Sequence, residues 1–291
     1  MRPPVEPEAI VERLWPGRGA GVEPLGGGIT NRNFKVSLDG DAFVLRIGGK
    51  DTELLGIDRA DEHAASRVAA GLGLAPEVVA FVEPEGYLVT RYVEGEVGKV
   101  DVERVGAALR RLHDGPSLPA RFDSFRVVEV YRATALERGA GAPPAYDRAK
   151  ELADRIEARR AGATPRPCHN DLLNANFIAD GEHLWIVDWE YAGMGDPFFD
   201  LGNFAVNHEL DEEGEHALLA AYGADDHDAL VLMRFMSDFR EAMWGVVQQA
   251  ISQLDFDFVD YADQHFGRLE RIAAEPRFRE ALQATKAQPF Q

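Results

Sequence analysis

Two short polar segments constrain this chain more than any other feature. Residues 168–176 read CHNDLLNAN and residues 186–190 read IVDWE, so that Asp188 ends an apolar run twelve positions after Asn176. Phosphoryl transfer needs an acceptor for a hydroxyl proton and oxygen ligands that hold Mg²⁺ against ATP. The order of the groups predicts Asp171 as the proton acceptor, Asn176 and Asp188 as metal ligands, and His169 as a residue that holds the loop. A polar loop that only caps turns is the alternative, and the presence of all three oxygen-bearing groups disfavours it.

The length and charge of the chain narrow the class of protein. A chain of 291 residues is long enough for two lobes, since domains commonly hold about 100 to 200 residues. The net charge of −19 disfavours nucleic acid as a partner, because binding of nucleic-acid phosphates needs a positive surface. The same charge would attract a cationic small molecule. Acidity that serves only solubility is an equal explanation.

The sequence carries no pattern typical of secretion or membrane insertion. The N-terminus lacks a basic region followed by an apolar run, and no segment approaches the roughly 18 apolar residues of a membrane span. We therefore expect a cytoplasmic protein without a membrane span. Cys168 is the single cysteine, which excludes an internal disulfide and a cysteine-cluster metal site. We interpret it as a small buried thiol.

The order of the predicted elements indicates an α+β fold with two lobes. Residues 22–47 combine a glycine-rich turn with two alternating segments and a two-residue hairpin signal, which predicts an antiparallel sheet. A helix over 58–70 and two strands within 76–90 follow. We place the boundary after residue 93, with residues 1–93 as the ATP-binding lobe and residues 94–291 as the catalytic and acceptor-binding lobe. Helices of the second lobe are predicted at 102–113, 145–161, 212–222, 229–254 and 259–274.

The motifs resemble one known superfamily. Residues 168–176, residues 187–191 (VDWEY) and residues 199–203 (FDLGN) resemble the aminoglycoside phosphotransferase and choline kinase superfamily, which has a two-lobed protein-kinase-like fold. The order Asp-aromatic-Glu-Tyr is similar to that of the choline and ethanolamine kinase branch. The run over 244–262 looks like the choline kinase segment that lines the choline pocket. The resemblance extends from the glycine-rich loop to about Phe266.

The resemblance implies a nucleotide site in the first lobe. Arg46 stands on the third predicted strand, where protein kinases carry a lysine that contacts ATP phosphates, and Glu62 on the next helix is its expected partner. The glycine-rich loop would bring backbone amides close to a phosphate, although it lacks the GxGxxG spacing and a flexible turn is the alternative. The predicted nucleotide-binding residues are Gly27, Gly28, Thr30, Asn31, Arg46, Glu62, Arg91 and Val93.

The resemblance also implies an acceptor pocket lined by aromatic side chains. It carries over onto Trp244, Phe256 and Tyr261, and Glu190 and Tyr191 complete the predicted set, with a packing role as an equal alternative for Tyr191. Independently, the apolar stripe of the helix predicted at 229–254 does not include Trp244, which favours a cleft position for this indole. Aromatic faces attract quaternary ammonium groups through cation–π interactions. An indole that only covers the helix edge is the alternative.

One departure from the resembled pattern concerns Asn207. Choline kinases place an acidic residue near this position, close to the quaternary ammonium group, and Asn207 is not acidic. Glu209 is the nearby carboxylate that could substitute for it. The departure leaves the head group of the acceptor open and does not affect the predicted reaction.

These features together predict an ATP- and Mg²⁺-dependent kinase that phosphorylates the hydroxyl group of a small amino alcohol. Choline is the favoured acceptor and ethanolamine the second. An aminoglycoside kinase, or another small-molecule hydroxyl kinase of the superfamily, is the first alternative, and the aromatic residues speak against it. A non-catalytic binding protein of the same fold is disfavoured because Asp171, Asn176 and Asp188 are all present. The expected partner is a cationic alcohol, and the oligomeric state stays open.

Overall fold

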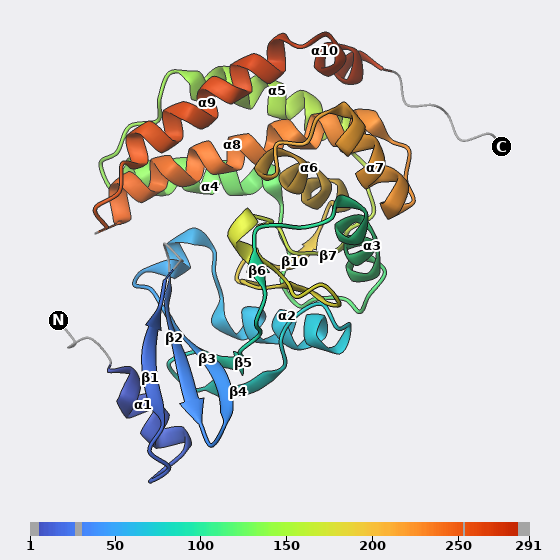
Figure 1. The fold of residues 1–291 in the computed structure, drawn as a ribbon. Coiled ribbons are helices and arrows are strands. Elements are labelled where there is room, and N and C mark those ends of the chain that lie inside the picture. The colour runs from blue at the N-terminus through green and yellow to red at the C-terminus, as the bar shows by residue number, and fades with distance from the viewer. Residues whose placement is uncertain (1–5, 27–30, 253, 285–291) are drawn as a thin grey trace.

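A five-stranded sheet followed by a helix-rich region forms the fold in the computed structural model, which describes residues 6–26, 31–252 and 254–284. Figure 1 shows the sheet at one end of the molecule and the long helices at the other. The predicted order of strands, one helix, strands and then helices is present, but it follows an N-terminal helix over residues 7–14 that was not predicted. Gly27, Gly28 and Thr30 of the predicted nucleotide site lie outside the described residues.

The sheet is antiparallel throughout and has the strand order β1-β2-β3-β5-β4. Its central pair is joined at Asp39 and Gly40, whose φ angles of 52° and 91° fit the turn that an Asp-Gly hairpin favours. Helix α1 adds Ile10 and Val11 to the core on one face. The bounds are α1 (Pro7–Leu14), β1 (Gly21–Leu25), β2 (Asn31–Leu38), β3 (Asp41–Gly48), β4 (Val78–Val82) and β5 (Tyr87–Arg91).

Strand β3 sets the direction of Arg46. Its side chains alternate between the two faces of the sheet, and Phe43, Leu45 and Ile47 all belong to the core shared with α1. Arg46 therefore points to the opposite face. After the short 3-10 turn η1 (Thr52–Leu55), helix α2 (Arg59–Gly71) begins at the cap residue Asp58, whose side chain accepts from the amides of residues 60 and 61.

The helix-rich region is organised around α8 (His227–Ile251). Of its 25 residues, 19 are buried, because helices pack around it on several sides. The amphipathic helix predicted at 229–254 is thus a central helix that other helices surround. A side chain outside its apolar stripe can therefore be buried in the core and need not face a cleft. The surrounding helices are α4 (Ser124–Glu137), α5 (Ala145–Arg160), α6 (Pro197–Asn207), α9 (Phe258–Ala274) and α10 (Pro276–Gln283).

Two predicted helices agree residue for residue with α3 (Val102–His113) and α7 (Glu212–Tyr222), whereas α4, α6 and α10 were not predicted. Helix α6 gives no periodic signal because eight consecutive residues of it, 199–206, are all buried. Gly202 lies among them, and a Cβ atom there would be 2.7 Å from the backbone of α8. The glycine is therefore required by the close approach of α6 and α8.

Short strands hold the loops between the two regions. Strand β6 (Glu96–Val97) pairs with β8 (Phe177–Ala179), which pairs with β9 (Leu184–Ile186), and β7 (Arg166–Cys168) pairs with β10 (Gly193–Gly195). The predicted lobe boundary falls between the end of β5 and β6 and stays a prediction. None of the described helices is both long and apolar enough to cross a membrane.

Candidate active site

The loop after β7 is fixed by Asp200, a fully buried residue of α6. One carboxylate oxygen of Asp200 accepts from the backbone amide of His169 at 2.8 Å and the other from that of Asn170 at 2.7 Å. The ring of His113 contacts the same carboxylate at 3.0 Å. Asn170 has a φ of 67°, a conformation that asparagine tolerates better than most residues. Asp200 thus fixes the backbone of the two residues that precede Asp171, and with it the position of Asp171.

His169 holds the loop and is neutral at pH 7. Its Nε2 lies 3.0 Å from the carbonyl oxygen of Val187, and its Nδ1 accepts from the amide of Asp171 at 3.2 Å. Burial lowers the pKa of His169 to about 4. These two contacts connect the loop to the segment that carries Asp188, in agreement with the predicted scaffolding role.

Asp171 lies in a buried ion pair with Arg240 of α8, with 3.0 Å between Oδ1 and Nη1. Burial raises the pKa of Asp171 to about 7, the guanidinium of Arg240 opposes this rise, and the carboxylates of Glu241, Asp188 and Glu190 add to it. A carboxylate whose pKa is near the working pH is well suited to accept a proton. The environment of Asp171 is thus that of a candidate general base.

Asn176 and Asp188 offer oxygen atoms beside this base. The amide nitrogen of Asn176 donates to the carbonyl of Asp171 at 2.8 Å, which leaves its Oδ1 for a cation. Burial raises the pKa of Asp188 to about 6; Arg46 opposes the rise, and Glu190 and Glu62 strengthen it. Carboxylate and carboxamide oxygens are the ligands that Mg²⁺ prefers, and a divalent cation would offset the excess of negative charge. The residues present fit a magnesium site.

Arg46 is the centre of an ion-pair cluster between β3, α2 and the Asp188 segment, which we call the Arg46 cluster. Its guanidinium contacts Glu62 at 2.9 Å, Glu190 at 3.1 Å and also Asp188. The three carboxylates hold the pKa of Arg46 above its usual value despite burial. The predicted pair of Arg46 and Glu62 is therefore present in the structure.

Arg59 of α2 belongs to the same cluster. It contacts Glu62 at 2.6 Å, Glu190 at 3.0 Å and the side-chain oxygen of Asn31 at 3.0 Å. The amide nitrogen of Asn31 donates to Glu190 at 2.9 Å. Asn31, the first residue of β2, thus connects this strand to the Arg46 cluster. Glu190, predicted to contact the acceptor, lies in this cluster, and its role stays a prediction.

Arg91 and Val93 lie at the far end of β5, away from the Arg46 cluster. The guanidinium of Arg91 pairs with Asp41 at 2.9 Å and with Glu77 at 3.3 Å, and it lies over the ring of Phe43. Val93 follows the strand with an intermediate exposure. The described contacts therefore place Arg91 on the outside of the sheet, and a part for these two residues in nucleotide binding stays a prediction.

The aromatic residues predicted for the acceptor pocket gather next to Arg240. Tyr261 donates from its hydroxyl group to Glu241 at 2.7 Å, Glu241 also contacts Arg240, and the guanidinium of Arg240 lies 4.3 Å from the ring centre of Tyr191. Trp244 packs edge-on against Phe258 and Tyr261. Arg240 and Glu241 thus connect Asp171 to Tyr261.

The aromatic residues differ in the fraction of the side chain that is exposed to solvent. The indole of Trp244 is only 7% exposed and belongs to the core around α8, whereas Phe256 is 44% exposed at the edge of the same cluster. Trp244 is therefore packed within the core, deeper than the position at the helix edge that was the alternative to a cleft. A contact of Trp244 with an acceptor stays a prediction.

Asn207 and Glu209 occupy different surroundings. The amide nitrogen of Asn207 lies 3.4 Å from the carbonyl of Leu172, next to Asp171, whereas Glu209 lies on the surface with a φ of 51°. The buried carboxylate that the structure places among the aromatic residues is Glu241. Glu241 is therefore a stronger candidate than Glu209 for an acid facing the acceptor.

Sequence reasoning missed four charged residues of this site. Arg59 and Asp200 lie in the first turns of α2 and α6, and Arg240 and Glu241 lie in the middle of α8. The signal for the last two was present: adjacent opposite charges interrupt the apolar run of residues 239–247. Charged residues in a buried helix need partners, so such a pair marks a polar site within the core.

Comparisons with known proteins agree with this geometry. Residues 21–236 match the phosphotransferase enzyme family (APH). The crystal structure of a choline/ethanolamine kinase family protein from Mesorhizobium loti superposes with a TM-score of 0.80 and 32% identity over 94% of this chain and 97% of that chain. The Protein LicA of Haemophilus influenzae strain Rd is 27% identical over 84% of this chain and all of its own length. Ethanolamine kinase 2 of Homo sapiens is 26% identical over 84% of this chain and 74% of its own.

The two-lobed fold and the loop around Asp171 define a phosphotransferase with the protein-kinase-like fold. More distant structures share this fold, such as the spectinomycin phosphotransferase with a TM-score of 0.61 and 13% identity. Within this class, the chain belongs to the choline/ethanolamine kinase family of phosphotransferases. The predicted superfamily, its branch and the enzyme class are thereby confirmed.

Proposed function

We propose that this protein is a kinase that uses ATP and Mg²⁺ to phosphorylate the hydroxyl group of a small amino alcohol, with choline as the favoured acceptor and ethanolamine as the second. One observation supports the proposal: Asp171 contacts Asn176 and lies near Asp188, and it also pairs with Arg240, which contacts Glu241 beside the aromatic residues. We call the part of the site with Asn176 and Asp188 the phosphate side and the part with Arg240 and Glu241 the acceptor side.

On the phosphate side, the side chains bind and orient ATP. Arg46 is the cation for the phosphates, and Glu62 holds it on the inner face of β3. Asn176 and Asp188 would hold Mg²⁺, which supplies positive charge against the phosphates when it is bound. Asp171 orients the acceptor hydroxyl group and takes its proton as the oxygen attacks the terminal phosphorus, while the bond from that phosphorus to the bridging oxygen breaks and ADP leaves.

The charge on the acceptor side favours an acceptor with a single positive charge. Asp171 and Glu241 are two carboxylates, and Arg240 is the one guanidinium that contacts both of them among the described residues. One negative charge is left over, which matches one ammonium group. An aminoglycoside carries several ammonium groups and would need more carboxylates than this side of the site provides. The faces of the Phe256 and Tyr261 rings, whose centres lie 6.0 Å apart, would add cation–π attraction.

A screen of acceptors tests the proposed function. ADP release from ATP and Mg²⁺ is measured with choline, ethanolamine, aminoglycosides and other hydroxylated metabolites. We expect the highest kcat/KM for choline and a lower value for ethanolamine, because the trimethylammonium group offers more apolar surface to aromatic rings. Preference for an aminoglycoside would leave the kinase class standing and would contradict the amino-alcohol acceptor.

The exposed ring of Phe256 allows a test of the aromatic cluster that does not disturb the core. Phe256→Ala is expected to raise the KM for choline by roughly 3- to 30-fold, the loss of one cation–π contact of about 0.5 to 2 kcal/mol. The KM for ATP should change little. Because a ring binds the ammonium group similarly in ground and transition states, kcat should change less than KM. Steady-state kinetics with each substrate varied in turn measure these effects.

Val259→Ala is the matched control, since Val259 is 56% exposed in the same segment and carries no aromatic face. Trp244→Ala should also raise the KM for choline, but its indole is part of the core, so its melting temperature must be compared with that of the wild type. An unchanged KM for choline in a folded Phe256→Ala protein would count against the predicted pocket.

A further inference from the structure

A cavity of about 240 Å³ lies at the end of β7 opposite to the catalytic loop. It is bordered by the ends of α3, α5 and α7, the start of β7 and the start of α6. Sites for drug-sized ligands commonly measure about 300 to 1,000 Å³, so this cavity suits a small ligand. No residue of the Arg46 cluster or of the aromatic cluster lines it.

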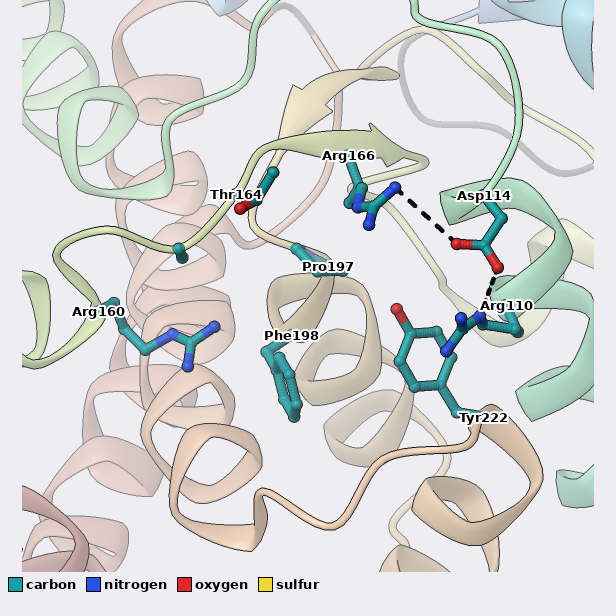
Figure 2. Close-up of a pocket in the computed structure, with 9 residues that line it drawn as sticks. Arg110, Asp114, Arg160, Thr164, Arg166, Pro197, Phe198 and Tyr222 are labelled. Atoms are coloured by element: carbon teal, nitrogen blue, oxygen red, sulfur yellow. Dashed lines mark hydrogen bonds and ion pairs between the residues drawn. The ribbon is translucent and has the colours of Figure 1, made fainter. Parts of the chain in front are cut away.

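Three arginines line this cavity in a chain whose net charge is −19. Figure 2 shows Arg160 on one side of the cavity and Arg110, close to Tyr222, on the other, with Arg166 between them at the top of the view. One carboxylate, Asp114, lies among the lining residues. Asp196 and Asp226 pair with Arg160 from beside the cavity, so the positive charge left for a ligand comes from Arg110 and Arg166, which share Asp114.

The three guanidinium groups differ in how firmly carboxylates hold them. Arg160 makes two bonds of 2.8 Å to Asp196, and Arg110 contacts Asp114 at 2.5 Å. Arg166 is 3.9 Å from Asp114, beyond hydrogen-bond distance, and that is its single ion pair among the described residues. Arg166 therefore keeps its donors for a ligand. A planar guanidinium group matches the oxygen atoms of a phosphate group, and two or three arginines around one cavity favour such an anion.

The cavity also contacts a chain of hydrogen bonds that leads to the catalytic loop. Tyr222 lines the cavity, and its hydroxyl group is 2.9 Å from the ring of His113. His113 contacts Asp200, whose carboxylate holds the backbone of His169 and Asn170. A ligand in the cavity would thus lie against the residues that support the loop, without entering the active site.

From this arrangement we propose that the cavity lined by Arg110, Arg160 and Arg166 binds a phosphate group, as the free ion or as a small phosphate monoester, at a second site separate from the active site. The proposal rests on the cavity and its charges and does not depend on which alcohol the enzyme phosphorylates. The free phosphate ion and a phosphate monoester differ only in the organic group on one oxygen atom. The experiment therefore measures the binding of both.

Calorimetric titration with inorganic phosphate, and separately with phosphocholine, tests the proposal. The wild-type protein is expected to bind at least one of them. The double variant Arg110→Gln/Arg166→Gln should bind that ligand at least about tenfold more weakly, because it loses charged hydrogen bonds to the anion. Arg160 is kept, since its bonds to Asp196 support the start of α6. Because phosphocholine is also the expected product and can bind the active site, the comparison uses the affinity that the double variant loses. A larger loss for phosphocholine would identify a monoester site at the cavity, and a larger loss for phosphate a site for the free ion.

Arg126→Gln is the matched control, because Arg126 is 47% exposed, close to the 49% of Arg166, and lies on α4 away from the cavity. It should bind as the wild type does. The double variant should keep the melting temperature and the basal turnover of the wild type, since neither arginine contacts the active site. Absence of binding by the wild type to both ligands, or equal binding by the double variant, would overturn the proposal.

Discussion

Replacing Asp171 by asparagine is expected to lower kcat by roughly 10²-fold or more and to leave the Kd for ATP nearly unchanged. Asparagine has the same shape and cannot take a proton, so the effect reports on the base and not on packing. The carboxylate is also the partner of Arg240, and its loss leaves that guanidinium with Glu241 alone. Turnover under saturating substrates, together with ATP titration, measures the two quantities.

Glu241→Gln provides the comparison for this experiment. It removes the other carboxylate bound to Arg240 without touching the proposed base, so kcat should fall much less than in Asp171→Asn. If both variants lose the same activity, the charge balance around Arg240 matters more than proton transfer. Turnover close to that of the wild type in Asp171→Asn would remove Asp171 from the chemistry.

Asp188→Ala is expected to abolish measurable phosphate transfer. The substitution removes the proposed carboxylate ligand and leaves only the carboxamide of Asn176, which is a weaker donor for Mg²⁺. It also frees Arg46 from one of its three carboxylates. Activity is measured while the Mg²⁺ concentration is raised, and we expect no return to the rate of the wild type. Full rescue by excess Mg²⁺ would mean that Asp188 is not a principal ligand.

A neighbouring carboxylate serves as the control. Asp180 lies in the turn between β8 and β9, where it accepts from the amides of residues 182 and 183. Asp180→Ala removes a negative charge from the same stretch of chain without touching the Arg46 cluster. It should keep the activity of the wild type, so a loss there would point to an effect of folding.

Features that depend on residues close in the chain were accessible from the sequence. The hairpin at Asp39 and Gly40 follows from the torsion angles that these residues favour, and α3 and α7 follow from their periodicity and their aspartate caps. The spacing of the groups on the loop after β7 likewise indicated the reaction class. Family membership then confirmed that class.

Contacts between distant segments were not accessible in the same way. Arg240 meets Asp171 across 69 positions, and Arg59 meets Glu190 across 131, because helices and loops are brought together only when the core closes. No periodicity encodes which buried charge will face which partner. The burial of Trp244 was not accessible for a related reason: the helix that carries it is enclosed by other helices, so its sequence does not reveal a solvent side.

The sequence by itself determined the order of sheet and helices, some of the helices and the reaction class, and it predicted a loop with a proton acceptor and oxygen ligands, because each of these depends on residue types at short spacing. Only the tertiary structure decided that Arg240 and Glu241 stand between Asp171 and the aromatic cluster, and that Arg110, Arg160 and Arg166 meet at one cavity. The physical reason is that a charge acquires its partner, its burial and its pKa from the elements that pack against it. Those elements come from parts of the chain that local patterns do not connect.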